Sequence, residues 1–346
     1  MRTGIRLPGL ASCPALFAAV VLPLVHPASA SPVQGLTRFG AEEPHVGTLV
    51  RIDAYVPADA GPPQIFRAVF DRVAELERIF STYRPDSELR QLEVRAWRHA
   101  VPVSGELSEL LGRALELARA SGGAFDPTLG RATRLVRASG WGREGPASAA
   151  LEEALLESGW QHVEIRGSPP TTYLSDRGLA MDLGGIAKGY IADQALAELA
   201  RLGVERAIVA VAGDIAIGDP PPGEAGWTIA LDAVGRRGTS ERSLVLRNAG
   251  VSTSGSRERY YLRSGQRCSH IFAVGSPCAL PASAVSVVAK DAALADGLAT
   301  ALAAAGPERS ERLLQQYPQA RAYWASESPY DAPVGGPLSV RGPSQR

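Results

Sequence analysis

Residues 291–305 constrain the fold more than any other segment, because this predicted helix is apolar on almost every side. At 100° per residue its leucines form one stripe, while Asp296 and Thr300, spaced i and i+4, lie together on the opposite side. Alanines surround this pair, and the helix has no Lys, Arg or Glu that would make a solvated face. Such a helix must be covered all round, so the chain has to build layers of structure around it.

Asp296 and Thr300 have two interpretations. In the first, Asp296 caps a neighbouring loop or pairs with a distant arginine, and Thr300 bonds back to a backbone carbonyl. In the second, the two side chains supply oxygen ligands to a hard cation such as Mg²⁺, which would keep waters and bind substrate phosphates. The helix alone leaves both open.

Hydrophobic periodicity predicts the elements that could cover this helix. Residues 50–56 alternate apolar and polar positions, as in a strand with one buried face, and Pro62-Pro63 begins a helical pattern that reaches Phe80. Helices packed on a mostly antiparallel sheet suit this order, which indicates the α+β class and a single large domain. Further helices are expected at 104–121, 147–158, 187–201 and 307–316, and further strands at 207–211, 227–231, 243–246, 259–262 and 284–289.

The N-terminus reads as an export signal over residues 1–30. Arg2 and Arg6 precede an apolar run at 15–25, and Ala28-Ser29-Ala30 is a small-residue cleavage site. A lipoprotein box ending at Cys13 is the alternative. We therefore expect a periplasmic protein, or one attached to the outer side of the cytoplasmic membrane.

Residues 31–44 are predicted to be a linker, 45–325 the folded domain, and 326–346 a flexible tail rich in Ser, Pro and Gly. Cleavage of the signal peptide leaves Cys268 and Cys278, in a compartment that permits disulfides. Pairing of these cysteines and two separate buried thiols both remain open.

The overall charge excludes one class of partner. Lys plus Arg number 36 and Asp plus Glu number 36, so no net field would gather nucleic acid or an anionic membrane surface. Any binding of phosphate must therefore be local.

A glycine turn at residues 181–190 is the best local candidate for phosphate binding. Its glycines let the backbone approach a ligand, the following helix offers free N–H groups, and Lys188 adds a positive charge. The arrangement suits a pyrophosphate, although it matches neither a Walker A loop nor G-x-G-x-x-G, and a plain helix-starting turn is the alternative.

Other segments carry chemistry that is less specific. His270 is either a general base or a satisfied core histidine. Aromatic rings and a carboxylate in Ser81-Thr82-Tyr83 and in residues 124–128 could frame a planar ligand.

Taken in order, these pieces resemble the FAD:protein FMN transferase family, the ApbE-type flavin transferases, from about residue 46 to residue 306. Each motif is modest, but six in register are hard to obtain by chance. The matching segments are Val46-Gly47-Thr48, Ser81-Thr82-Tyr83, 123–128, 182–190 with Asp193, Thr253-Ser254-Gly255, and 295–300.

The resemblance implies a role for each matching position. Mg²⁺ would be held by Asp296, Thr300 and a backbone oxygen of Gly185, and His270 and Ile271 would lie by the flavin. In the mechanism that we expect from this, His270 is the candidate catalytic base. FAD, the substrate, would contact Val46, Tyr83, Ala124, Phe125, Asp126, Asp182, Lys188, Thr253 and Ile271.

The implied reaction moves FMN from FAD onto a Thr or Ser hydroxyl of a partner flavoprotein, expected to be membrane-associated, with release of AMP.

Two departures from the family pattern stand out. Ala273 replaces an acidic residue after His270-Ile271, and Ala212 replaces the first glycine of a G-G-D motif, a mild change unless that position needs positive φ. Hydrolysis of FAD to FMN and AMP, and non-catalytic periplasmic FAD binding, are therefore kept as alternatives. We also expect a Cys268–Cys278 disulfide to hold His270 in place of the missing turn.

Overall fold

The computed structural model describes residues 35–57, 59–231, 242–255, 259–272, 278 and 284–324. The predicted signal peptide with Cys13, the position of Ala273, and the predicted tail at 326–346 lie outside these residues. Within the described part of the chain, no helix has the length and apolar character needed to cross a membrane.

A seven-stranded sheet forms the centre of the molecule, and every strand in it pairs antiparallel to its neighbours. This sheet, with helices packed on it, confirms the predicted fold class. The strands lie in the order β1 (Leu36–His45), β2 (Thr48–Pro57), β6 (Ala207–Val211), β7 (Asp214–Ile217), β10 (Ala249–Ser254), β13 (Val285–Ala289) and β14 (Arg321–Trp324).

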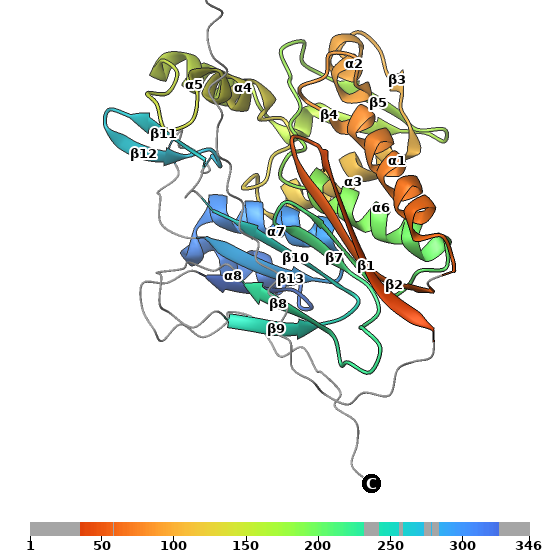
Figure 1. Ribbon diagram of the computed structural model, residues 1–346. Helices are drawn as coiled ribbons and strands as arrows, with labels where there is room; N and C mark the ends of the chain where they lie inside the picture. Colours follow the sequence, from red (N-terminus) through yellow and green to blue (C-terminus); the bar gives the residue numbers. More distant parts are fainter. Residues whose placement is uncertain are drawn as a thin grey trace, which may run out of the picture.

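Helices cover one face of this sheet (Figure 1). α7 (Ala292–Ala305) packs on β10, β13 and α6 (Ala187–Arg201), and its residues are almost all buried, as its apolar pattern predicted. The same main core includes side chains of α1 (Pro62–Phe80), α2 (Glu88–Arg95), α3 (Gly105–Ala120) and α8 (Pro307–Gln315).

The other face of the sheet is covered by the hairpin of β8 (Trp227–Leu231) and β9 (Arg242–Leu246). Trp227 and Ile229 pack there against Ile208 and Val251. These two sheet residues point away from the helices because side chains alternate along a strand. A small sheet of β3 (Val101–Pro102), β5 (Thr171–Leu174) and β4 (Val163–Arg166), the last preceded by a short 3₁₀ turn (Trp160–His162), lies beside α3.

A smaller unit, which we call the cap, consists of α4 (Gly130–Ser139), α5 (Ser148–Leu156), β11 (Tyr260–Arg263) and β12 (Gln266–Ser269). Figure 1 shows the cap gathered at one end of the molecule, away from β8 and β9. It has its own apolar cluster, which includes Val136, Leu151 and Tyr261. Cys268 and Cys278 form a disulfide here, so the predicted pairing is confirmed.

The structure differs from the sequence predictions at several elements. β1 occupies most of the predicted linker and pairs with β2 along its whole length. It was missed because it is an edge strand without a fully buried face, so its sequence lacks a clear apolar alternation. α2 and α4 were also missed, since both are short and rich in charged residues.

Candidate active site

The glycine turn before α6 forms the floor of the candidate site. The backbone N–H of Gly184 donates to Oδ1 of Asp182 (2.8 Å), and the N–H of Asp182 donates to the carbonyl of Pro127 (2.7 Å). A side chain at Gly185 would begin 2.9 Å from the Thr300 hydroxyl oxygen, so only a glycine lets the turn approach Thr300 so closely. Two of the predicted metal ligands therefore lie in contact.

Close packing of α6 and α7 sets the position of these groups. A Cβ at Gly189 would fall 2.1 Å from the carbonyl oxygen of Ala292, so the two backbones touch at this point. The carboxylate of Asp193 accepts hydrogen bonds from the N–H groups of Ala292 and Ala293, both at 2.8 Å. It thereby satisfies free donors at the start of α7. Burial raises the pKa of Asp193 to about 7.

A half-buried lysine, Lys188, and two buried carboxylates form a charged cluster between the two helices and the sheet. The Lys188 Nζ lies 2.9 Å from Oδ2 of Asp214 and 3.3 Å from Oδ2 of Asp296, and it donates to the Gly184 carbonyl at 3.0 Å. The N–H of Gly189 also donates to Asp296 (3.1 Å), whose exposed fraction is 1%. Asp296 thus accepts a hydrogen bond from the first turn of α6 and also faces Lys188.

The electrostatics of this cluster follow from burial and mutual charge. Burial raises the pKa of Asp296, the negative charge of Asp214 raises it further, and Lys188 opposes both. Burial disfavours the charge on Lys188, but the two carboxylates outweigh it and raise its pKa above the usual value. The lysine therefore stays charged and partly neutralises two acids.

Asp214 was not among the predicted site residues. It follows the turn between β6 and β7, and the Ser252 hydroxyl donates to it at 2.5 Å. The signal in the sequence was the Ala212-Gly213-Asp214 motif. Ala212 has φ 55°, so this position does require the conformation that glycine adopts without strain, and its replacement is not neutral for the backbone.

Thr253, a predicted FAD contact, and its neighbour Ser254 have different partners. Its hydroxyl lies 2.7 Å from that of Ser286 on the neighbouring strand, whereas the hydroxyl of Ser254 lies 3.4 Å from that of Thr300. Adjacent residues of β10 point to opposite sides, so only one of the two can face the site. Ser254 was part of the quoted motif but was not chosen.

Of the residues predicted to frame a planar ligand, one side chain is exposed and the others are buried or hydrogen-bonded within the protein. Tyr83 is 68% exposed. Phe125 and Ala124 are buried, and Phe125 belongs to the main core. The Asp126 carboxylate accepts from the N–H and hydroxyl of Thr128 and from the N–H of Trp160, and burial raises its pKa. Phe125 and Asp126 are thus committed to the protein's own packing and hydrogen bonds.

His270 follows β12 in the cap. Its Nδ1 lies 3.0 Å from the carbonyl of Arg259; because a carbonyl can only accept, Nδ1 carries the proton and Nε2 is left as an acceptor. Trp141 packs edge-to-face against the imidazole, with ring centroids 5.9 Å apart. Burial lowers the pKa of His270 to about 4, and the charge of Lys188 lowers it too. The next residue, Ile271, donates its N–H to the Ser269 hydroxyl at 3.0 Å.

Val46 occupies the two-residue turn between β1 and β2 with φ 55° and packs on the main core. The turn between β6 and β7 lies beside it, because the N–H of Ala212 donates to the carbonyl of Leu49 at 3.1 Å. Among the predicted site residues, Gly185 contacts Thr300 and Lys188 contacts Asp296. Val46 belongs to a strained turn.

The donor set suits a hard divalent cation. Among the described residues there is no group of three or more His, Cys, Asp or Glu side chains that could hold a metal by themselves. Asp296, Thr300 and Ser254 instead offer one carboxylate and two hydroxyl oxygens beside the Gly185 backbone. Mg²⁺ commonly takes one or two carboxylates and completes its shell with waters and substrate phosphates, so these residues fit it.

Comparison with known proteins yields a consistent group of relatives. The sequence profile of the ApbE family matches residues 46–324. The chain is 34% identical over 290 residues to an FAD:protein FMN transferase of Treponema pallidum, covering 79% of this chain and 80% of the relative. It is 28% identical over 256 residues to an FAD:protein FMN transferase of Klebsiella pneumoniae, covering 72% and 78% of the two chains.

Solved structures are similar over the same region. The flavinyl transferase ApbE of Pseudomonas stutzeri, in its apo form, has a TM-score of 0.73 and 27% identity, covering 84% of this chain and 92% of that one. The ApbE protein of Thermotoga maritima has a TM-score of 0.72 and 28% identity, covering 83% and 93%.

Proposed function

The chain belongs to the ApbE family, and from this membership we propose that it is an Mg²⁺-dependent FAD:protein FMN transferase. In this proposal it takes FAD as substrate and moves the FMN half onto a Thr or Ser hydroxyl of a partner protein, with release of AMP. The observation that carries the proposal is the charged cluster of Lys188, Asp214 and Asp296, in contact with the glycine turn. Oxygen donors fixed beside a lysine that is still 29% exposed suit a pyrophosphate and its cation.

Asp296, Thr300 and the Gly185 backbone would hold the cation, with Ser254 close to Thr300. The bound cation would draw negative charge from the pyrophosphate oxygens. Lys188 fixes the two carboxylates beside the glycine turn, since its ammonium lies between the two acids and donates to the Gly184 carbonyl. Phosphoryl-type transfer depends mainly on positioning and charge neutralisation, which suits a site that has no obvious nucleophile of its own.

The chemical step transfers one proton and exchanges one P–O bond. His270 Nε2 accepts the proton of the acceptor hydroxyl, the hydroxyl oxygen bonds to the FMN phosphorus, and the bond from that phosphorus to the AMP oxygen breaks. AMP leaves with the bonding electron pair. His270 suits the role of base because its Nδ1 proton is engaged with Arg259 and its lowered pKa keeps Nε2 free at neutral pH.

We further propose that the protein works outside the cytoplasmic membrane on a membrane-associated flavoprotein. The signal-peptide pattern of residues 1–30 supports export. The Cys268–Cys278 disulfide supports it as well, since structural disulfides persist in oxidising compartments.

One assay tests the proposal against its alternatives. The mature protein is mixed with FAD, Mg²⁺ and an acceptor domain that carries an exposed Thr, and matched samples contain EDTA or an acceptor with Thr replaced by Ala. We expect flavin covalently bound to the acceptor, an equal amount of AMP, and neither product with EDTA. Free FMN and AMP without labelled acceptor would indicate hydrolysis, and intact bound FAD would indicate a binding protein; either result would refute the transferase proposal.

A further inference from the structure

Tyr83 is an exposed aromatic residue with one covered face. The side chain is 68% exposed, yet the guanidinium of Arg137 lies 4.2 Å from the centre of its ring. Arg137 comes from the last turn of α4 in the cap, far from Tyr83 in sequence. A cation at this distance from an aromatic ring attracts it, so the ring has a preferred orientation despite its exposure.

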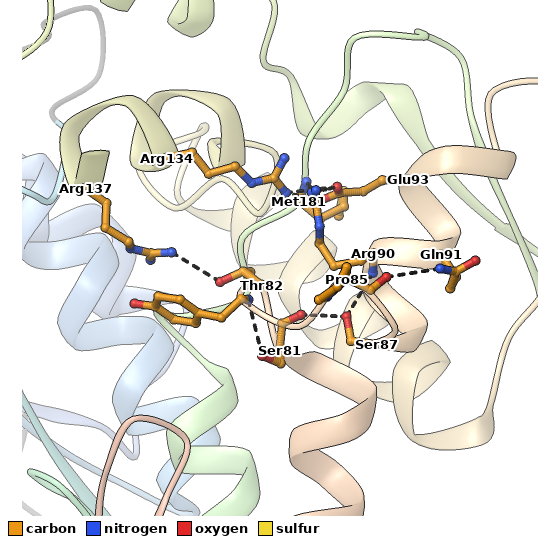
Figure 2. A network of polar contacts seen from close by, with 11 residues as sticks. Ser81, Thr82, Pro85, Ser87, Arg90, Gln91, Glu93, Arg134, Arg137 and Met181 are labelled. Atoms are coloured by element: carbon orange, nitrogen blue, oxygen red, sulfur yellow. Dashed lines mark hydrogen bonds and ion pairs between the residues drawn. The ribbon is translucent and has the colours of Figure 1, made fainter. Parts of the chain in front are cut away.

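The backbone that carries Tyr83 is already fixed. The Ser81 hydroxyl accepts from the N–H groups of Tyr83 and Arg84, at 3.3 and 3.2 Å, and Ser87 donates to the Ser81 carbonyl at 2.6 Å. Figure 2 shows this turn with Arg137 reaching toward it, where its Nη1 lies 3.5 Å from the Thr82 hydroxyl. The turn sets the place of Tyr83, and Arg137 sets the direction of its ring.

Arg137 differs from the two other arginines of α4. Arg131 forms ion pairs with Glu153 and Glu157, and Arg134 pairs with the buried Glu93. Within the described residues Arg137 has no carboxylate partner, and its Nε is buried without a hydrogen bond. The contacts of Arg137 are therefore with the turn at residues 81–83, namely the ring of Tyr83 and the hydroxyl of Thr82, and the guanidinium is available to orient the ring.

The end of α4 is held firmly enough for this contact to matter. Glu93, on α2, accepts from Arg134 at 2.6 Å and from the N–H of Met181 at 2.7 Å (Figure 2). One buried carboxylate therefore connects α4 to α2 and to Met181, in the segment that leads into the glycine turn. Arg137 is thereby fixed relative to the floor of the site.

We propose that Arg137 is a positioning residue for flavin binding, which acts through Tyr83. Its guanidinium covers one face of the tyrosine ring and leaves the other face to stack on the isoalloxazine ring of FAD. The inference rests on the proposed function, in that FAD must bind at Tyr83. A ring that is oriented in advance loses less freedom when the flavin binds, which strengthens binding without a direct contact to the ligand.

The test compares two ligands that share the adenosine and pyrophosphate groups but differ in the flavin. We expect R137A to raise the Kd for FAD about fivefold to tenfold and to leave the Kd for ADP unchanged, both in Mg²⁺. R137K, which keeps the charge but loses the planar group, should fall between. R131A is the matched control, because it removes an arginine from the same helix and should change neither Kd.

A double-mutant cycle with Tyr83→Ala then decides whether Arg137 acts through the ring. In the Y83A protein, R137A should have no further effect on FAD binding. An equal loss in that background, or an equal loss for ADP, would overturn the proposal, since Arg137 would then act on FAD directly or through its charge. None of these measurements needs transfer, so a protein that binds FAD without transferring FMN refutes the proposed function and still tests this inference.

Discussion

The charged cluster under the glycine turn and the cap contribute to one site but are built differently. Lys188, Asp214 and Asp296 sit between two helices and the central sheet, and Asp296 is 1% exposed. Tyr83 is 68% exposed and contacts Arg137 of α4 in the cap. His270 follows β12 of the cap, which has a small apolar cluster and one disulfide.

This difference indicates that the main core and the cap have different roles in the proposed site. Charge neutralisation needs groups that do not move, and the main core supplies them at the contact of α6 and α7. Groups that meet the flavin and the acceptor must allow ligands in and out, and the cap has a small apolar cluster of its own and is joined to the core at α4 through the Glu93–Arg134 pair. Changes in the two regions should therefore have separable effects.

The largest expected effect lies in the charged cluster. We expect Asp296→Asn to lower Mg²⁺-dependent transfer by about 100- to 1000-fold, because it removes the carboxylate that faces Lys188 and the proposed cation. Initial rates of acceptor flavinylation measure this. Asp53→Asn, which removes an acid of β2 that pairs with Arg38 of β1, is the control and should keep full activity. Unchanged transfer in D296N would remove Asp296 from the proposed site.

The second prediction concerns the cap alone. Replacing both Cys268 and Cys278 with Ser opens a loop with a sequence separation of 10 residues, and a loop of this size is worth about 3 kcal/mol in the chain-entropy model. Amide exchange in β11 and β12 should accelerate by about 100-fold, while exchange in α7 stays the same. Equal acceleration in both would mean that the cap and the core unfold as one unit.

A third and smaller effect follows from the lowered pKa of His270. Its usual pKa is 6.5 and burial lowers it to about 4 in the folded protein, so between these values only the unfolded chain binds the proton. The histidine's contribution to stability is complete above pH 6.5 and is lost as the pH falls toward 4. Ring-nitrogen NMR should show Nδ1 protonated at pH 7 and titration near pH 4; titration near 6.5 would contradict the lowered pKa of this half-buried imidazole.

The smallest expected effect is at the turn that leads to Asp214. Ala212→Gly should increase the free energy of unfolding by about 1 kcal/mol, because glycine adopts φ 55° without strain. Ala210→Gly, within β6, is the matched control and should destabilise by about 0.5–1 kcal/mol. Urea denaturation measures both, and a loss of stability in both variants would show that the turn is not strained.

Strong periodic patterns predicted the longest helices and the strands β2, β6, β8, β9, β11 and β13, but not β7, β10 and β14 of the central sheet. The pattern at 291–305 corresponds to α7 (Ala292–Ala305), and α6 and β8 have the predicted bounds. β1 was missed, because the pairing that stabilises an edge strand comes from its neighbour and not from its own sequence. The short helix α4, which carries Arg137, was missed for want of an apolar stripe long enough to recognise.

Sequence alone determined the family, the fold class, and the association of Asp296, Thr300, Gly185 and Lys188, since each lies in a local motif with its own chemistry. Tertiary structure decided which neighbouring groups join them. Asp214 and Ser254 face the site while Thr253 pairs with Ser286, because strand pairing places one side of β10 against α7. Such choices depend on contacts between segments distant in the chain, and no local pattern records them.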